Sequence, residues 1–237
     1  MSIDLFCVPH AGGSARSFLA WRRTFPPQIR VRPLELAGRG RRSREPRQET
    51  VQRVAADLAQ LEPPPRYAIL GHSMGGLIAY ELALSLVAQG KTPPELVVVA
   101  GTRPPHLLSP VDQAALAELP DDELLEALAG SGTIPPSLRT SPMRELFVPI
   151  VRGDLRLIAS YEPTVARLPV DVQAWFGADD PMTPEPTMAE WARYTSRTCS
   201  AREFPGTHFF PHTRLPDVIA HLTSLVRPQN GDAEENE

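Results

Sequence analysis

The segment Gly71–Gly75 has the residue types and spacing of a turn that presents a nucleophile. It reads Gly-His-Ser-Met-Gly, with Ser73 at its centre, after a strand-like apolar run and before a helical pattern. Glycines on both sides would let the strand and helix approach closely, so the backbone could take a strained turn that exposes the serine hydroxyl. The simpler alternative is a serine in an ordinary glycine turn near a helix start. A nucleophilic role for Ser73 would require partner residues elsewhere in the chain.

A serine hydroxyl is a weak nucleophile, so it requires a base and a group that orients the base. In hydrolases with this kind of turn, an Asp or Glu and then a His follow the serine along the chain. Asp179 and Asp180 follow a predicted strand, and His208 lies in a glycine turn after the next strand. We predict a catalytic triad of Ser73, His208 and Asp180, in which Asp180 holds the imidazole in the required tautomer.

Two alternatives remain open within this triad. Asp180 occupies the fourth position of a G-x-x-D-P turn, whereas Asp179 is the more typical turn-forming residue, so we prefer Asp180 as the acid. His212 is the main competitor of His208 as the base. We assign packing, structural or surface roles to the remaining histidines, which are His10, His72, His106 and His221.

A tetrahedral intermediate also needs hydrogen-bond donors for its oxyanion, and loss of one donor costs roughly 2.7 to 4 kcal/mol. Met74 directly follows the serine and offers one backbone N–H group. The glycine turn after the first predicted strand offers a second, which we assign to Ala11. The helix that begins after Ser73 would direct further N–H groups toward developing negative charge.

These turns lie between elements that alternate regularly along the chain. Apolar strand-like runs are followed by turns and then by helical spacing, an order that predicts a doubly wound α/β layer with a mostly parallel sheet. The expected strands lie near residues 3–8, 29–36, 67–71, 95–101, 169–177 and 199–204. Since parallel strands end at one edge, that edge should gather the predicted site.

The pattern changes after the strand that ends near residue 101. Residues 104–165 contain short helical patterns and need no strand, which predicts a helical lid inserted over the carboxyl ends of the strands. We therefore divide the chain into a core of residues 1–103 and 166–227, a lid of residues 104–165 and a disordered acidic tail of residues 228–237.

Composition narrows the classes of partner. The chain has 237 residues and a formal net charge of −4, which gives no general reason to expect binding to nucleic acid. No apolar run is long enough for a membrane span, and the N-terminus lacks the pattern of a secretory signal, so we expect a cytoplasmic protein. We also expect a monomer. Cys7 and Cys199 are expected to be reduced core residues. We expect no metal ion.

Five segments together resemble the type II thioesterases that accompany polyketide and nonribosomal peptide synthases. They are FCVPHAGGSARSF, LELAGRGRRSREP, GHSMGG, FGADDPMT and FPGTHFF, in this order, and the resemblance covers nearly all of residues 1–227. One departure is Ala37, which stands where the family usually has proline before the glycine of its GRG segment. This change affects loop rigidity more than chemistry.

The resemblance implies an α/β-hydrolase fold with a mobile helical lid. It also implies hydrolysis of acyl groups from the phosphopantetheine arm of acyl or peptidyl carrier proteins, with no cofactor of the enzyme's own. Editing of stalled or aberrant units is the usual service, and release of an intermediate or product is the alternative. The arginines from Arg39 to Arg47 could attract an acidic carrier protein, or could form a solvated loop that only stabilises the fold.

Two other functions fit parts of the sequence. The same triad would serve an α/β-hydrolase that acts on free small esters or acyl-CoA, and a catalytically inactive interaction protein could keep the fold. Six apolar lid residues could line an acyl channel, although packing within the lid is expected for most of them: Leu107, Leu108, Leu124, Leu125, Leu128 and Phe147. The acyl chain length cannot be predicted from these residues.

Overall fold

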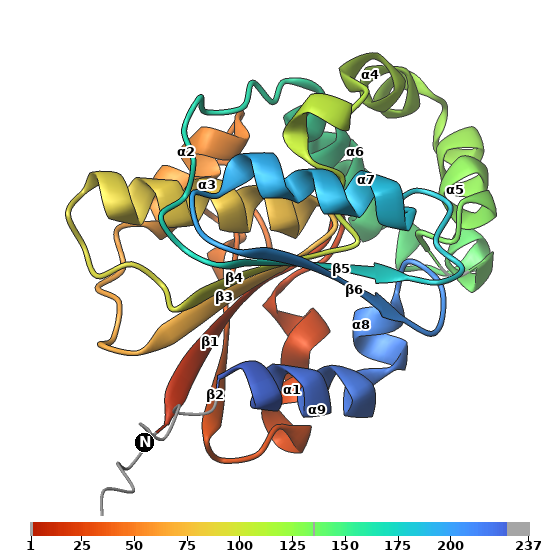
Figure 1. Cartoon of the computed structure of the whole chain (residues 1–237). Helices are drawn as coiled ribbons and strands as arrows, with labels where there is room; N and C mark the ends of the chain where they lie inside the picture. The colour runs from red at the N-terminus through yellow and green to blue at the C-terminus, as the bar shows by residue number, and fades with distance from the viewer. Residues whose placement is uncertain (1, 135, 227–237) are drawn as a thin grey trace, which may run out of the picture.

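Six strands form one parallel sheet at the centre of the computed structural model, which describes residues 2–134 and 136–226 (Figure 1). The order across the sheet is β2-β1-β3-β4-β5-β6, and each neighbouring pair is parallel. The strands are β1 (Ile3–Val8), β2 (Ile29–Pro33), β3 (Tyr67–His72), β4 (Leu96–Ala100), β5 (Val172–Gly177) and β6 (Cys199–Phe204). The predicted fold class, an α/β-hydrolase sheet flanked by helices, is confirmed.

Burial explains the composition of the strands. Every residue of β3 and β4 is buried, which is why both strands are almost continuously apolar rather than alternating. The edge strand β6 is exposed along most of its length and accordingly contains Ser200, Arg202 and Glu203. The expected strand at residues 29–36 is shorter in the structure, where β2 ends at Pro33 and the Leu34 N–H group makes one further hydrogen bond to the Cys7 carbonyl oxygen.

Helices cover both faces of the sheet (Figure 1). On one face lie α2 (Val51–Leu58), α3 (Met74–Ala88) and α7 (Glu185–Ala189), and on the other lie α1 (Leu19–Thr24) and α9 (Leu215–Leu225). Two buried apolar clusters correspond to these two faces. Shorter helical turns complete the core: η1 (Ala15–Phe18), η2 (Gly40–Arg42), η5 (Glu190–Tyr194) and α8 (Phe210–Thr213).

Helices α2 and α3 show two kinds of helix burial. Apolar residues in α2 lie on one face, and Thr50 caps its N-terminus by accepting a hydrogen bond from the Arg53 N–H group. Helix α3 is apolar on all sides and buried over most of its length, because it packs between the sheet and surrounding segments. The element that begins directly after Ser73 is therefore held on every side.

The segment predicted as a lid contains only helices among its described residues. They are η3 (Pro105–Leu107), α4 (Pro110–Glu118), α5 (Asp121–Gly130), η4 (Pro136–Thr140) and α6 (Arg144–Ala159). A third apolar cluster, which includes Ala117, Leu124 and Val148, packs these helices against one another. Mobility of this segment as a lid stays a prediction, and the predicted acidic tail lies outside the described residues.

No helix in residues 2–134 and 136–226 combines the length and apolar character needed to cross a membrane.

Candidate active site

The candidate residues gather at the carboxyl edge of the sheet, as expected from parallel strands. The chain order reverses between β1 and β3, since β2 lies outside β1 while β4 continues on the other side of β3. Loops that leave neighbouring strands toward opposite faces open a crevice at such a reversal. His10 and Ala11 follow β1 there, and Ser73 follows β3.

Ser73 lies in a strained turn between β3 and α3. Its φ is 56° and its ψ is −123°, and it is the one non-glycine residue with positive φ among the described residues. The flanking glycines are required by close backbone approach: a Cβ at Gly71 would lie 1.9 Å from the Gly75 carbonyl oxygen, and a Cβ at Gly75 would lie 2.3 Å from the Val8 carbonyl oxygen. Strain of this kind persists only where the surroundings enforce it.

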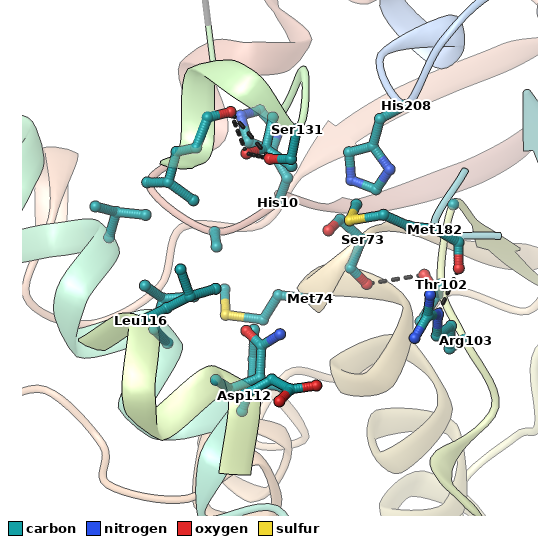
Figure 2. A pocket seen from close by; sticks show the side chains of 18 of the residues that line it. His10, Ser73, Met74, Thr102, Arg103, Asp112, Leu116, Ser131, Met182 and His208 are labelled. Carbon is teal, nitrogen blue, oxygen red and sulfur yellow. Dashed lines mark hydrogen bonds between the residues drawn. The ribbon is translucent and has the colours of Figure 1, made fainter. Parts of the chain in front are cut away.

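Hydrogen bonds to the Ser73 backbone fix this turn. The Ser73 N–H group donates to the Ala100 carbonyl oxygen over 2.8 Å, and the Thr102 hydroxyl donates to the Ser73 carbonyl oxygen over 2.8 Å (Figure 2). The indole N–H group of Trp191 donates in turn to the Thr102 carbonyl oxygen. Sequence analysis missed Thr102 and Trp191, which sit 29 and 118 residues from the serine, because only the fold brings them to it.

His208 and Asp180 form a buried pair. The Nδ1–H group of His208 donates to Oδ2 of Asp180 over 2.7 Å, and the two residues are 3% and 4% exposed. Thr183 and the Met182 N–H group donate to the same carboxylate. Burial acts to raise the pKa of Asp180, but these hydrogen bonds, with the largest contribution from His208, outweigh it and hold the pKa below its ordinary value.

The alternative acid and base occupy different surroundings. Asp179 is exposed, and its carboxylate makes no hydrogen bond within the described residues. His212 packs among aromatic rings that include Phe18, Trp21 and Phe209, and no carboxylate accepts from it there. Burial lowers the pKa of His212 to about 4. Of the two candidate pairs, only His208 and Asp180 have the hydrogen bond that a triad requires.

Ser73 and His208 line one pocket of about 330 Å³ between the sheet edge and the helical segment. Figure 2 shows the imidazole of His208 beside Ser73, with Leu116 across the pocket from them. No hydrogen bond joins the Ser73 hydroxyl to His208 in the described part of the chain, and such bonds often form only with substrate bound. The far wall is largely apolar and includes Leu116, Leu128, Ile134, Val151, Leu155 and Ile158.

Ala11 and Met74 also line this pocket. Neither N–H group donates to another backbone group in the loops and turns that the structure describes. Gly12, next to Ala11, has a φ of 75°, a left-handed conformation that favours glycine and turns the loop away from β1. Both predicted oxyanion donors therefore border the space in which a reacting carbonyl would lie.

A buried ion pair joins the loop after β2 to the helical segment, and sequence analysis missed one of its members. Asp154 of α6 accepts hydrogen bonds from both terminal nitrogens of Arg39, and also from the Gly12 N–H group over 2.8 Å. Arg39 donates further to the Gly13 carbonyl oxygen. The only signal in the sequence is an acidic residue beside the apolar positions Val151 and Leu155.

The other arginines of the segment from Arg39 to Arg47 divide into two groups. Arg42 pairs with Glu45 and Asp57, and Arg47 donates to the carbonyl oxygens of Pro149 and Ile150 in α6. The side chains of Arg41 and Arg44 are exposed and form no ion pair within residues 2–134 and 136–226. Much of this loop therefore stabilises the fold, as the simpler alternative predicted.

The six apolar residues considered for an acyl channel also divide. Only Leu108 and Leu128 border the pocket. Leu124 and Leu125 are fully buried within the helical cluster, Phe147 packs against that cluster, and Leu107 is exposed. Most of these six residues therefore do not border the pocket, as expected. Leu116, Ile134 and Val151 do border it, although sequence analysis did not single them out.

Comparisons with known proteins agree with this architecture. The family model described as "Thioesterase domain" matches residues 4–225. The chain is 32% identical to the thioesterase PikA5 of Streptomyces venezuelae, over 93% of this chain and 81% of that protein. It is 30% identical to ClbQ from the colibactin NRPS/PKS pathway, whose structure superimposes with a TM-score of 0.85 over 95% of this chain and 97% of ClbQ.

A third structure is described as the type II thioesterase BorB from the borrelidin biosynthetic cluster. It is 25% identical, with a TM-score of 0.81 over 96% of this chain and 92% of BorB. The family model spans both the sheet and the helical segment, so the match includes every loop that borders the pocket. The chain belongs to the thioesterase domain family and is a thioesterase.

Proposed function

We propose that this thioesterase hydrolyses acyl groups from the phosphopantetheine arm of acyl or peptidyl carrier proteins of polyketide or nonribosomal peptide synthases. The observation that carries the proposal is a strained serine turn and a buried His208–Asp180 pair on one wall of an otherwise largely apolar pocket. The colibactin NRPS/PKS pathway named for ClbQ and the description of BorB as a type II thioesterase of a biosynthetic cluster support the choice of carrier-bound substrates. The proposed biological role is the removal of stalled or aberrant acyl units from these synthases.

In the first step, the Ser73 hydroxyl attacks the thioester carbonyl carbon while its proton moves to Nε2 of His208. Asp180 accepts from the opposite ring nitrogen and stabilises the imidazolium that forms. The N–H groups of Ala11 and Met74 receive the negative oxygen of the tetrahedral intermediate. Collapse breaks the carbon–sulfur bond, and His208 returns the proton to the departing pantetheine thiol.

In the second step, His208 removes a proton from water, which attacks the acyl carbon on Ser73. The second tetrahedral intermediate breaks the bond to the serine oxygen, which regains a proton from His208, and the free acid leaves. Every transfer uses side-chain or backbone groups of one chain. We accordingly propose that hydrolysis needs neither a resident cofactor nor a second copy of the protein.

We further propose that Arg41 and Arg44 contribute to encounter with the carrier protein. Their side chains are the exposed members of the arginine segment, whereas Arg39, Arg42 and Arg47 have internal partners. Carrier proteins of these systems are typically acidic, so attraction would raise the rate of encounter and weaken with salt. Rising salt should therefore slow hydrolysis of carrier-bound substrate more than hydrolysis of a small free thioester.

The test of the main proposal compares acyl carrier substrates with acyl-CoAs that bear the same acyl group. A higher kcat/KM for the carrier-bound series is expected, and equal values would assign the enzyme to free thioesters instead. A serine-reactive phosphonate should label the wild-type chain but not Ser73→Ala. Absence of labelling in the wild type, or equal labelling of both, would remove Ser73 as the nucleophile.

A further inference from the structure

Three histidines from separate segments converge beside the candidate active site. His10 follows β1, His72 ends β3 and His212 lies in α8. Each can offer one ring nitrogen so that the three nitrogens lie within 4.8 Å of one another. Their rings pack in pairs, with centroid separations of 5.2 Å for His10–His72, 5.3 Å for His72–His212 and 5.8 Å for His10–His212.

Each of these histidines has a buried nitrogen that lacks a hydrogen-bond partner in the described residues. These atoms are Nδ1 of His10, Nδ1 of His72 and Nε2 of His212. A buried polar group without a partner costs free energy, so native structures rarely leave three such groups within one cluster of side chains. The hydrolytic mechanism above uses none of the three atoms. They therefore point to a ligand that supplies their missing interactions.

The hydrogen bond of His72 determines which of its two ring nitrogens has a free lone pair and can bind a metal ion. Nε2 lies 2.8 Å from the carbonyl oxygen of His208, and a carbonyl oxygen can only accept, so Nε2 carries the proton. Nδ1 of the neutral ring then has a free lone pair. Metal-ligating histidines usually have this arrangement, with the second ring nitrogen donating to a backbone carbonyl or a carboxylate.

The surroundings disfavour the protonated form of all three rings, and the neutral form is the one that ligates a metal ion. Burial and the neighbouring His212, His208 and Arg39 lower the pKa of His10 to about 3, and burial lowers that of His212 to about 4. Burial and the other histidines also hold the pKa of His72 well below its ordinary value. Arg39 is the permanent cation that acts on His10, and Asp154 neutralises it through two hydrogen bonds.

We propose that His10, His72 and His212 form a site for one divalent transition-metal ion, for which Zn²⁺ is the appropriate probe. Three imidazoles suit borderline ions such as zinc, and a water molecule would complete a tetrahedral set. Zinc–nitrogen bonds of about 2.0–2.1 Å place tetrahedral ligands roughly 3.3 Å apart. Separations of up to 4.8 Å would therefore have to contract by at most about 1.5 Å through rotation of the rings.

The proposed ion would stabilise the structure and would take no part in the reaction. His10 adjoins Ala11, His72 adjoins Ser73, and the His72 ring holds the backbone of His208. An ion on these ligands would link the loops after β1, β3 and β6, which carry the proposed oxyanion donor, nucleophile and base. This site departs from the sequence-based expectation of no metal, and it is independent of which acyl substrate the enzyme takes.

The test uses the full chain without a polyhistidine tag, stripped with EDTA and then titrated with Zn²⁺. Native mass spectrometry should show one tightly bound zinc per chain, and the melting temperature should rise with free zinc as expected for a ligand of the folded state. Co²⁺ should give the visible absorption of a four-coordinate nitrogen site. His212→Gln should weaken zinc binding at least about tenfold, since it removes one ligand.

His106→Gln is the matched control, because His106 is partly exposed, bonds to Tyr194 and lies outside the cluster. It should bind zinc like the wild type. Melting in EDTA establishes that each variant is folded, and His10→Gln replaces His212→Gln if the latter is not. The proposal is overturned by the absence of stoichiometric zinc in the wild type, or by undiminished zinc binding in the folded cluster variant. Neither result bears on the hydrolytic proposal, which phosphonate labelling tests separately.

Discussion

The sheet edge and the helical segment form opposite walls of the same pocket, but they are built differently. At the sheet edge, polar groups are held by short hydrogen bonds, such as those that join His208 to Asp180 and Thr102 to Ser73. The opposite wall is made by apolar side chains such as Leu116 and Val151, within a cluster of its own. The sheet edge therefore has the fixed geometry that chemistry requires, whereas the helical wall has a shape that can select acyl groups.

Several polar contacts connect the core to the helical segment, including hydrogen bonds from Tyr161 and Thr164 to Glu81 of α3. The Arg39–Asp154 pair is the buried ion pair among them, and Arg47 adds hydrogen bonds to carbonyl oxygens of α6. Asp154 also accepts from the Gly12 N–H group, beside the proposed oxyanion donor Ala11. A change at Asp154 should therefore affect both walls, whereas changes within one wall should leave the other intact.

The largest expected effect is the difference in activity between variants of two histidines at the sheet edge, His208 and His212. His208→Ala should lower turnover roughly 10³-fold or more, because it removes the proposed base, and Asp180→Asn should cost a comparable factor. His212→Gln should keep at least about 100-fold more activity than His208→Ala, because no carboxylate orients His212 as a base. Steady-state hydrolysis of one acyl substrate, with circular dichroism as the folding control, measures this difference. Equal losses in the two histidine variants would contradict the assignment of the base.

The second prediction concerns the Arg39–Asp154 ion pair, which connects the two walls. Asp154→Ala should lower the free energy of unfolding by about 3–5 kcal/mol, because it leaves the Arg39 guanidinium buried without its counter-charge. Urea denaturation measures this change. The double variant Asp154→Leu/Arg39→Met should be more stable than Asp154→Ala, since it buries no lone charge. A loss below 1 kcal/mol in Asp154→Ala would show that the pair does not hold the walls together.

The third prediction concerns the pH dependence of the sheet edge. Burial lowers the pKa of His212 to about 4 in the folded chain, whereas an unfolded histidine titrates near 6.5. The stability that depends on a neutral His212 is therefore fully present above about pH 6.5 and is lost as the pH falls toward 4. One such residue changes the free energy of unfolding by about 1.4 kcal/mol per pH unit in this window.

Urea denaturation between pH 4 and 7, in EDTA, tests this prediction. The slope of the free energy of unfolding against pH should be shallower in His212→Gln than in the wild type by about 1.4 kcal/mol per pH unit. An unchanged slope in His212→Gln would mean that His212 already takes up its proton in the folded chain.

The smallest expected effect lies in the helical wall alone. Leu116→Trp adds bulk to the pocket opposite Ser73, so kcat/KM for long acyl groups should fall by roughly tenfold relative to short ones. Labelling of Ser73 by a small phosphonate should keep its wild-type rate, because the sheet edge is untouched. Equal losses for long and short acyl groups would show that this wall does not select by length.

The sequence by itself determined the alternation of strands and helices, the serine turn and the order Ser73, Asp180, His208. These are local signals: glycine appears where a Cβ would lie only 1.9 Å from a neighbouring carbonyl oxygen, and continuous apolar runs appear where both sheet faces are covered. The all-helical pattern of the segment after β4 was visible for the same reason, since helical spacing depends on residues only a few positions apart.

Only the tertiary structure decided which distant groups meet. It set Asp180 rather than Asp179 against His208, paired Asp154 with Arg39 across 115 residues, and brought His10, His72 and His212 together from three segments. Nothing local distinguishes such residues, because a carboxylate or an imidazole has the same neighbours in sequence whether its partner is water or a buried side chain. Their partners follow from the crossing of loops at the sheet edge and from the packing of α6 over it.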